Sequence, residues 1–191
     1  MIFFLIIFSY LLGSIPTAFI LVKVFQGKDI RKMGSGNPGT TNVIRSSGLL
    51  LGLITFIIDF LKGYIPIIIT LKSYPQYIYI SMFFVILGHI YSIFLKFKGG
   101  KGVATFFGVL FGISPKIFVI SGIFFIISLL LTHIVSISSL ISVIVSMFLF
   151  AFIEKHNIIS KLTFFLIISI IILRHKENII RLINKQEKRI F

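Results

Sequence analysis

Long apolar segments follow one another through this chain, separated by short polar connections. A helix needs about 20 mostly apolar residues to cross the hydrocarbon core of a membrane, and segments of about that length recur from end to end. The pattern predicts seven membrane-spanning helices, of which the fourth is short, rich in glycine and ends at Ser114–Pro115. We expect the spans at residues 2–22, 49–71, 77–95, 102–115, 117–133, 134–153 and 158–174.

These spans leave no room for a separate soluble domain, since 57% of the 191 residues are hydrophobic. We therefore expect an all-α integral membrane protein in which residues 1–191 form a single polytopic membrane domain. The first apolar segment starts at Met1, with no basic residue before it and no convincing cleavage site after it. We interpret it as a retained helix and not as a signal peptide.

The distribution of basic residues favours seven spans over six. The chain has 19 Lys and Arg against 5 Asp and Glu, a net charge of +14. Basic residues concentrate in cytoplasmic loops and meet anionic lipid there, so this charge does not indicate a nucleic-acid partner. Seven spans place most of the basic residues on one side, which puts the N-terminus outside and the C-terminus in the cytoplasm. The opposite side then carries only Lys72, Lys116, Lys155 and Lys161.

The most polar stretch is the loop of residues 34–45, on the predicted cytoplasmic side. Its glycines let backbone N–H groups approach an anion closely, and Arg45 adds a planar guanidinium that matches phosphate. An ordinary solvated turn has a similar composition, so this alternative stays open for the loop taken alone. The candidate binding residues in the loop are Gly34, Gly36, Asn37, Gly39, Asn42 and Arg45.

A second polar stretch opens the fourth span. A glycine-rich turn, a lysine and a helix N-terminus together favour an anion. The stretch is not a Walker A loop, because Lys101 is followed by glycine and not by Ser or Thr. A basic cytoplasmic turn is the simpler alternative, and two such stretches on one face weaken it. The candidate binding residues are Gly99, Gly100, Lys101 and Gly102.

A third polar stretch follows the seventh span. His175 and Asn178 are three residues apart and share a helical face. A basic membrane anchor would explain the neighbouring Arg174 and Lys176, but it does not explain this pair.

Span six carries a stripe of serines on one helix face. Ser136 and Ser139 lie near its cytoplasmic end, within reach of a site there. Ser142 and Ser146 are better explained by small-residue helix packing.

Two charged residues lie inside the second span. Each charge at a helix centre costs about 2.5–3.5 kcal/mol on insertion scales, so Asp59 and Lys62 should pair and face the protein interior. Whether they form a structural ion pair or line the site is left open. His89 in the third span is more consistent with a packing histidine, and His133 fits either role.

The polar groups thus gather at one membrane face, which indicates a reaction at the boundary between membrane and cytoplasm. The substrate would be a small anion, with a lipid partner reaching it from the bilayer. A phosphate-ester transporter or flippase would instead need polar residues through the bilayer centre, where only Asp59 and Lys62 fit. A lipid-binding scaffold would not need the glycine loops.

Three ordered segments resemble the motifs of the bacterial acyl-phosphate:glycerol-3-phosphate acyltransferases. The first comprises Gly13–Pro16 and Asp29–Arg45, the second comprises Gly88–Ile90 and Phe97–Thr105, and the third is Arg174–Ile179. The similarity covers nearly the whole chain. It implies seven spans in the bacterial cell membrane, with the active site on the cytoplasmic side.

The resemblance also implies a reaction. An acyl chain would pass from acyl phosphate to glycerol 3-phosphate, giving lysophosphatidic acid and phosphate in the first acylation of phospholipid synthesis. Functional coupling to the enzyme that forms acyl phosphate is a further implication. Phosphate-binding groups of the family correspond to Arg45, Lys101 and the glycine loops around them. Its polar active-site residues correspond to Ser35, Asn42, Ser139, His175 and Asn178.

The chain departs from the family pattern at Pro38 and Thr40, where Ile and Ala are usual, and at Tyr91–Ser92, where Phe-Pro is common. No polar active-site group is lost, so these differences concern loop shape more than activity.

Acyl phosphate is already activated, and the chain has no cysteine and no Gly-x-Ser-x-Gly sequence. We expect direct attack by the glycerol-3-phosphate hydroxyl, with no acyl-enzyme, cofactor or metal ion. Backbone N–H groups of the glycine loops would hold the developing negative charge. Either His175 or a substrate phosphate would be the base. No His-x4-Asp sequence follows any of the four histidines, which favours acyl phosphate over acyl-CoA as donor.

Overall fold

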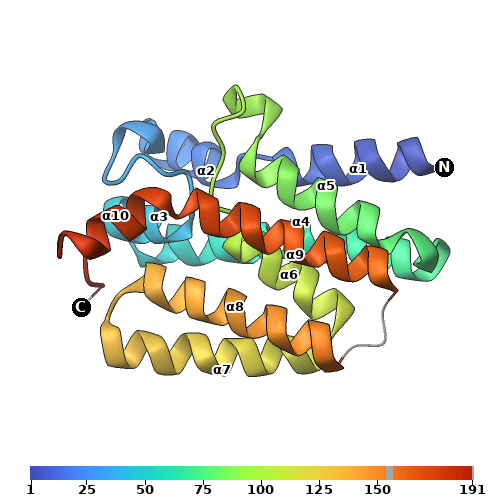
Figure 1. The fold of residues 1–191 in the computed structure, drawn as a ribbon. Coiled ribbons are helices and arrows are strands. Elements are labelled where there is room, and N and C mark those ends of the chain that lie inside the picture. Colours follow the sequence, from blue (N-terminus) through green and yellow to red (C-terminus); the bar gives the residue numbers. More distant parts are fainter. Residues whose placement is uncertain (154–156, 191) are drawn as a thin grey trace. The chain divides into compact units, whose positions relative to one another are not determined.

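A computed structural model describes residues 1–153 and 157–190, so Lys155, counted above on the outer side, lies outside the described residues. All regular structure in this part of the chain is helical (Figure 1). The longer elements are α1 (Ile2–Ser14), α2 (Thr17–Gln26), α3 (Thr40–Ser47), α4 (Leu49–Ser73), α5 (Ile78–Ile90), α6 (Val103–Ile113), α7 (Pro115–Thr132), α8 (Val135–Ile153), α9 (Ile158–Arg174) and α10 (Lys176–Ile183). Three short 3-10 turns are η1 (Ile30–Lys32), η2 (Pro75–Tyr77) and η3 (Ile93–Leu95).

The helices form two compact units, Met1–Ile113 and Ser114–Phe191. The first contains α1 to α6 and the second contains α7 to α10.

Each of the seven predicted apolar segments contains at least one α-helix. Among the described residues, five helical segments are long and apolar enough to cross a membrane, and the bent pair of α9 and α10 makes up to six. The predicted fourth span is the shorter helix α6, whose 11 residues cover only about 16 Å. The count of seven crossings therefore stays a prediction.

The predicted first span is not one straight helix. It is α1 and α2, separated at Ile15–Pro16. Proline has no N–H to continue the helix, so the break follows from its chemistry.

Two glycines bring α1 against α5, which lie side by side in Figure 1. A Cβ on Gly13 would collide with the backbone of Val85, and one on Gly88 would collide with the backbone of Tyr10. Small residues at these points let the two helix backbones touch, as is common between membrane helices. These two motif glycines therefore serve packing.

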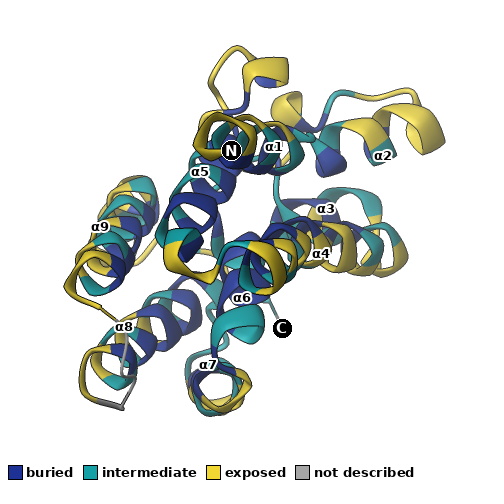
Figure 2. Cartoon of the chain, turned by 90° about the vertical axis from the view of Figure 1, so that its right-hand side faces the viewer, coloured by how far each residue is buried: buried dark blue, intermediate teal, exposed yellow. Residues whose placement is uncertain are grey.

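Glycines also allow the close packing of α6 against α4. A Cβ on Gly63 would collide with the carbonyl oxygen of Thr105, and one on Gly108 with that of Phe60. The middle of α6, from Thr105 to Leu110, is buried (Figure 2). A short helix is tolerated at membrane depth where protein surrounds it, so the length of α6 is compatible with a membrane location.

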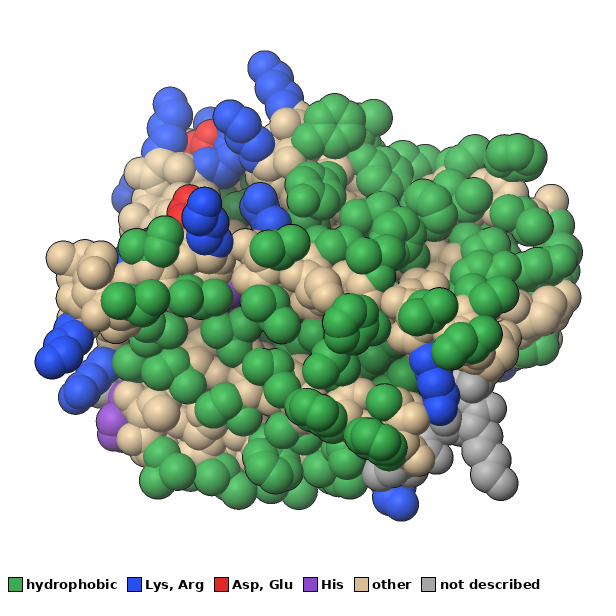
Figure 3. Space-filling model, viewed as in Figure 1, with side chains coloured by type: hydrophobic (Ala, Val, Ile, Leu, Met, Phe, Trp, Pro, Cys, Tyr) green, Lys and Arg blue, Asp and Glu red, His purple; other side chains and the backbone are tan. Residues whose placement is uncertain are grey.

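The outer surface of each unit suits a lipid environment. Figure 3 shows hydrophobic side chains over most of the drawn face of the helices. The long helix α7 is exposed along much of its length, with apolar side chains such as Val119, Ile126 and Leu130 pointing outward. Hydrocarbon accepts such a surface, whereas an exposed polar row would be costly.

In the second unit, α8 and α9 pack through aromatic rings. The rings of Phe150 and Phe164 are stacked with their centroids 4.1 Å apart, and both side chains are buried. The N-terminus of α9 is capped by a side chain, since Asn157 accepts a hydrogen bond from the Ser160 N–H at 2.8 Å.

Replacing Gly108 by alanine tests the contact of α6 with α4. Overpacking of this kind costs about 1–3 kcal/mol, so the variant should unfold at a lower temperature in detergent. Gly122 in α7 has nothing within 4 Å of its Cβ position and is the matched control, for which alanine should be neutral or stabilising. Equal unfolding temperatures for the two variants would contradict the packing.

Candidate active site

An ion pair stabilises the η1 turn, which immediately precedes the first polar loop. Asp29 accepts the backbone N–H of Arg31 at 3.0 Å, and its carboxylate contacts the Arg31 guanidinium at 2.7 Å. The hydrogen bond from the Arg31 side chain lowers the pKa of Asp29 to about 2. The guanidinium also lies over the Phe19 ring, 4.9 Å from its centroid. These contacts fix the η1 turn from which the loop starts.

Asn42 is the centre of the first loop. Its amide nitrogen donates to the carbonyl oxygens of Met33 at 2.9 Å and Ile30 at 3.4 Å. Its amide oxygen accepts the backbone N–H of Ser35 at 2.9 Å. The side chain is buried, and its donors and acceptor serve the loop backbone. Asn42 was predicted as a binding residue, and the contacts present here give it a role in loop shape.

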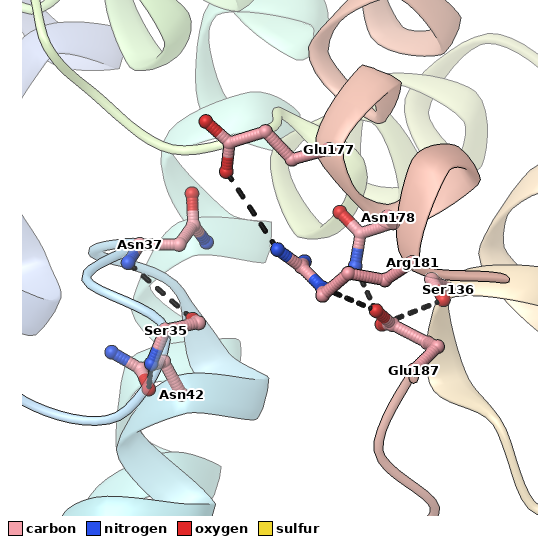
Figure 4. A network of polar contacts seen from close by, with 8 residues as sticks. All are labelled: Ser35, Asn37, Asn42, Ser136, Glu177, Asn178, Arg181 and Glu187. Carbon is pink, nitrogen blue, oxygen red and sulfur yellow. Dashed lines mark hydrogen bonds and ion pairs between the residues drawn. The ribbon is translucent and has the colours of Figure 1, made fainter. Parts of the chain in front are cut away.

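Gly34 is required by this arrangement. Its φ is +54°, in the left-handed region, and a Cβ there would collide with the amide oxygen of Asn42. Farther along, the Asn37 side chain lies close to Gly39, where a Cβ would be 2.8 Å from the Asn37 amide nitrogen. Figure 4 shows Ser35, Asn37 and Asn42 around this turn.

The N–H groups of the first loop are largely committed to the protein. Gly36 and Gly39 donate theirs to the carbonyls of Met33 and Asn37, each at 2.9 Å. The N–H of Asn37 donates to Ser35 Oγ at 3.4 Å. The expected nest of anion-binding N–H groups is therefore absent from these positions. The exposed hydroxyl of Ser35 and the exposed Arg45 side chain on α3 are the polar groups presented outward.

Two backbone N–H groups of the second loop, residues 99–102, are also hydrogen-bonded within the protein. The N–H of Gly99 donates to the Ile90 carbonyl at 3.0 Å, and that of Gly100 donates to the His89 carbonyl at 3.2 Å. A Cβ on Gly99 would collide with the His89 carbonyl, and one on Gly100 would collide with the His89 ring. The N–H groups of Gly99 and Gly100 both bind the end of α5. A substrate-binding role for these two residues stays a prediction. These glycines provide close packing.

Lys101 and Gly102 come after the packed part of the second loop. Gly102 has φ +88° and turns the chain into α6, which begins at Val103. The first N–H groups of a helix have no partner within the helix and carry its positive dipole end. Lys101 is half-buried at this end. A cation next to a helix N-terminus is an arrangement that favours phosphate.

In the second unit, His175 lies at the junction of α9 and α10, which are bent by 52°. Its Nδ1–H donates to the Ile171 carbonyl at 2.8 Å, and the side chain is buried. In the neutral ring this hydrogen bond places the proton on Nδ1 and leaves Nε2 as an acceptor. Asn178 follows in the first turn of α10 and is also buried.

Glu187 is the residue that the sequence patterns did not single out. Its carboxylate accepts hydrogen bonds from Asn178 Nδ2 at 2.6 Å, Ser136 Oγ at 3.0 Å and Arg181 Nε at 2.7 Å (Figure 4). Burial alone would raise the pKa of Glu187, but these three hydrogen bonds outweigh it and lower that pKa below its usual value. The spacing of Ser136, Asn178 and Glu187 gave no signal, because tertiary folding alone brings the C-terminal tail back to α8.

Two further serines of α8, Ser142 and Ser146, are buried and bond within their own helix. Ser142 Oγ donates to the Ser139 carbonyl at 2.9 Å, and Ser146 Oγ donates to the Val143 carbonyl at 2.7 Å. These contacts agree with a packing role for Ser142 and Ser146. Ser139 is buried at 5% exposure, and a direct role in the reaction stays a prediction for it.

The ionisable residues inside the second and third predicted spans have partners within the first unit. Asp59 and Lys62 form a buried ion pair with 2.7 Å between Oδ1 and Nζ. His89 is a packing histidine, as expected, with its Nδ1 3.0 Å from Thr105 Oγ1. In the second unit, His133 ends α7 in a left-handed conformation, and its carbonyl accepts the N–H of Ile190 at 2.8 Å.

Replacing Gly34 by alanine should disrupt the first loop, because the new methyl group meets Asn42 as well as a strained φ. Gly27 is the matched control, since its φ is +68° but nothing lies within 4 Å of its Cβ position. Backbone strain alone costs about 1–2 kcal/mol, and Gly34→Ala should exceed Gly27→Ala in lost stability. Equal losses would show that Asn42 does not shape the loop.

Replacing Glu187 by glutamine should lower the free energy of unfolding by about 1.5–3 kcal/mol at neutral pH. Because the folded protein has the lower pKa, this stabilisation is complete above about pH 4.5 and is lost as the pH falls through the folded value. The variant should therefore lose part of the acid dependence seen in thermal unfolding. An unchanged acid dependence would contradict the role of this carboxylate.

Comparison with known proteins gives consistent matches along nearly the whole chain. The family model for glycerol-3-phosphate acyltransferase matches residues 3–185. The glycerol-3-phosphate acyltransferase of Pelagibacter ubique (strain HTCC1062) is 46% identical over 94% of this chain and 92% of the relative. That of Aquifex aeolicus (strain VF5) is 42% identical over 97% of both chains.

Two solved structures have the same fold. Both are crystal structures of PlsY (YgiH), an integral membrane glycerol 3-phosphate acyltransferase. Its glycerol 3-phosphate form has a TM-score of 0.95 and 39% identity, covering 100% of this chain and 96% of that one. Its lysophosphatidic acid form has a TM-score of 0.90 and 38% identity, covering 98% and 94%. These likenesses confirm the all-helical integral membrane fold, and the chain belongs to the PlsY-type glycerol-3-phosphate acyltransferase family of integral membrane acyltransferases.

Proposed function

We propose that this protein transfers a fatty acyl group from acyl phosphate to glycerol 3-phosphate. The products are 1-acyl-glycerol 3-phosphate (lysophosphatidic acid) and inorganic phosphate. One observation carries the acceptor and the product. The similar PlsY structures have a glycerol 3-phosphate form and a lysophosphatidic acid form, which are the acceptor and its acylated product.

The absence of sequence signatures for a nucleophilic cysteine or serine supports acyl phosphate as the donor. A mixed anhydride needs no further activation, and the sequence contains no cysteine and no Gly-x-Ser-x-Gly. Direct attack by the acceptor hydroxyl then suffices, and the enzyme contributes positioning and charge stabilisation.

Phosphate is held chiefly by side chains in this proposal. The guanidinium of Arg45 offers a planar, two-pronged contact, and Lys101 adds a point charge beside the N-terminus of α6. The hydroxyl of Ser35 is a neutral partner at the exposed turn of the first loop. Gly34, Gly36, Gly39, Gly99, Gly100 and Asn42 contribute by giving the loops their shape.

In the second unit, His175 is our candidate for the base or for orienting the attacking hydroxyl. The hydrogen bond from its Nδ1 to Ile171 fixes the tautomer that makes Nε2 the acceptor. We propose that Asn178 and Ser139 also take part, with Asn178 held by Glu187.

We further propose seven crossings, an N-terminus outside and a cytoplasmic site in the bacterial plasma membrane, from the bias of basic residues. Membrane lipid supplies the surroundings of the acyl chain. Functional coupling to the enzyme that forms acyl phosphate would follow from the reactivity of a mixed anhydride. The transporter alternative has lost its main support, since Asp59 and Lys62 bind each other and other groups of their own unit.

The donor is tested with purified protein and labelled glycerol 3-phosphate, supplied with acyl phosphate, acyl-CoA or acyl carrier protein. We expect labelled lysophosphatidic acid with acyl phosphate alone. Product formation with acyl-CoA or acyl carrier protein instead would contradict acyl phosphate as the donor. Absence of product with all three donors would contradict the proposed acyltransferase function.

Replacing Lys101 by alanine should lower kcat/KM for acyl transfer about 10²–10³-fold, because a preorganised cation next to the phosphate is lost. Lys98→Ala is the matched control, since Lys98 is an exposed lysine three residues earlier. Both variants should insert into the membrane equally. Full activity in Lys101→Ala would remove Lys101 from the mechanism.

Replacing His175 by alanine separates the two candidate bases. Loss of a general base costs about 10²–10⁴-fold in rate, so kcat should fall by this amount if His175 is the base. Acylation that is retained near the rate of the unchanged protein would assign the proton transfer to a substrate phosphate.

A further inference from the structure

A charged pair is buried in the first unit, and the proposed reaction does not use it. The side chains of Asp59 and Lys62 are 2% and 5% exposed, and their charged atoms lie 2.7 Å apart. Taking two charges out of water is unfavourable, and an apolar pair of similar volume would often serve stability as well or better. The pair therefore calls for a role besides stability.

The pair connects several elements of the unit. Lys62 Nζ donates to the Ile15 carbonyl at 2.9 Å, at the break between α1 and α2. Asp59 Oδ1 lies 4.0 Å from Nδ1 of His89, the last polar residue of α5. The same Nδ1 is 3.0 Å from Thr105 Oγ1 in the first turn of α6. The carboxylate thus faces a histidine that touches the helix following the second loop.

His89 in turn supports the second loop directly. Its carbonyl accepts the N–H of Gly100, and its ring lies where a Gly100 Cβ would be. A Cβ on Gly99 would collide with the same carbonyl. Lys101 is the next residue, so the position of His89 determines where the backbone before Lys101 can lie.

We propose that the Asp59–Lys62 ion pair and the His89 ring position the Gly99–Gly102 loop, and with it Lys101, for binding substrate phosphate. Asp59, Lys62 and His89 are positioning residues, because they act through the loop and do not touch substrate. The inference rests on the proposed function, in which Lys101 binds phosphate.

The Gly99–Gly102 loop depends on the orientation of the His89 ring, and polar contacts fix an orientation better than apolar ones. Nδ1 of the ring is hydrogen-bonded to Thr105 Oγ1 at 3.0 Å, and the Asp59 carboxylate 4.0 Å away favours the same orientation of the ring. An apolar side chain in place of Asp59 would fill space without adding this attraction. A ring that can turn leaves the glycine backbone against it free to shift. A displacement of about 1 Å at a binding group lowers its effect up to about 10²-fold.

The test compares kinetics with stability in three variants of the full chain in nanodiscs. The double variant Asp59→Leu/Lys62→Met removes both charges at once and leaves neither buried alone. His89→Asn keeps a polar atom near Nδ1 but removes the ring from Gly100. Thr70→Val is the control. Thr70 is a buried polar residue near the C-terminal end of the same helix α4, and its hydroxyl is hydrogen-bonded to that of Ser81 at 2.6 Å.

We expect the double variant to unfold at or above the temperature of the unchanged protein. Its KM for glycerol 3-phosphate should rise about tenfold or more, while kcat changes less than about threefold. His89→Asn should raise KM in the same way, and Thr70→Val should change the unfolding temperature without changing KM.

An unchanged KM in either the folded double variant or His89→Asn would overturn the inference and leave the proposed function standing. A rise of KM in Thr70→Val equal to that of the double variant would also overturn it, because any disturbance of α4 would then suffice. Absence of turnover by the unchanged protein would overturn the proposed function and the inference together.

Discussion

A backbone N–H or carbonyl group buried away from water needs a partner, and this constraint governs both polar loops of the protein. In apolar surroundings each unpaired group costs several kcal/mol. Asn42 meets the need in the first loop by bonding to Ser35, Met33 and Ile30. The second loop meets it by donating to the end of α5. The loops are thereby rigid enough to present a few charged side chains in fixed places.

Two structural uses of glycine are evident among the described residues. At Gly34 it permits a left-handed backbone beside Asn42. At Gly63, Gly99 and Gly108 it lets one backbone approach another without a side chain between them. In the proposed function the glycine-rich motifs act as scaffolding, and Arg45 and Lys101 attract the anion. Charged side chains on a rigid backbone need little reorganisation when the substrate arrives.

The sequence predicted the apolar segments well, because hydropathy over some 20 residues depends on composition and not on tertiary contacts. It also predicted the pairing of Asp59 with Lys62, since an unpaired charge inside a span is too costly. It did not predict that the N–H groups of Gly99 and Gly100 would be used within the protein. It missed Glu187 entirely. Both depend on segments distant in sequence meeting in space, and no local pattern records such a meeting.

In the proposed function, side chains bind the phosphate while the glycine loops keep their internal hydrogen bonds. A crystal structure of this protein with glycerol 3-phosphate bound tests it most directly, through the distances from the phosphate oxygens to their protein partners. We predict contacts of about 2.7–3.2 Å to the side chains of Arg45 or Lys101. The N–H groups of Gly99 and Gly100 should still bind the Ile90 and His89 carbonyls. Phosphate oxygens bound to those two N–H groups, with both carbonyls released, would contradict the account.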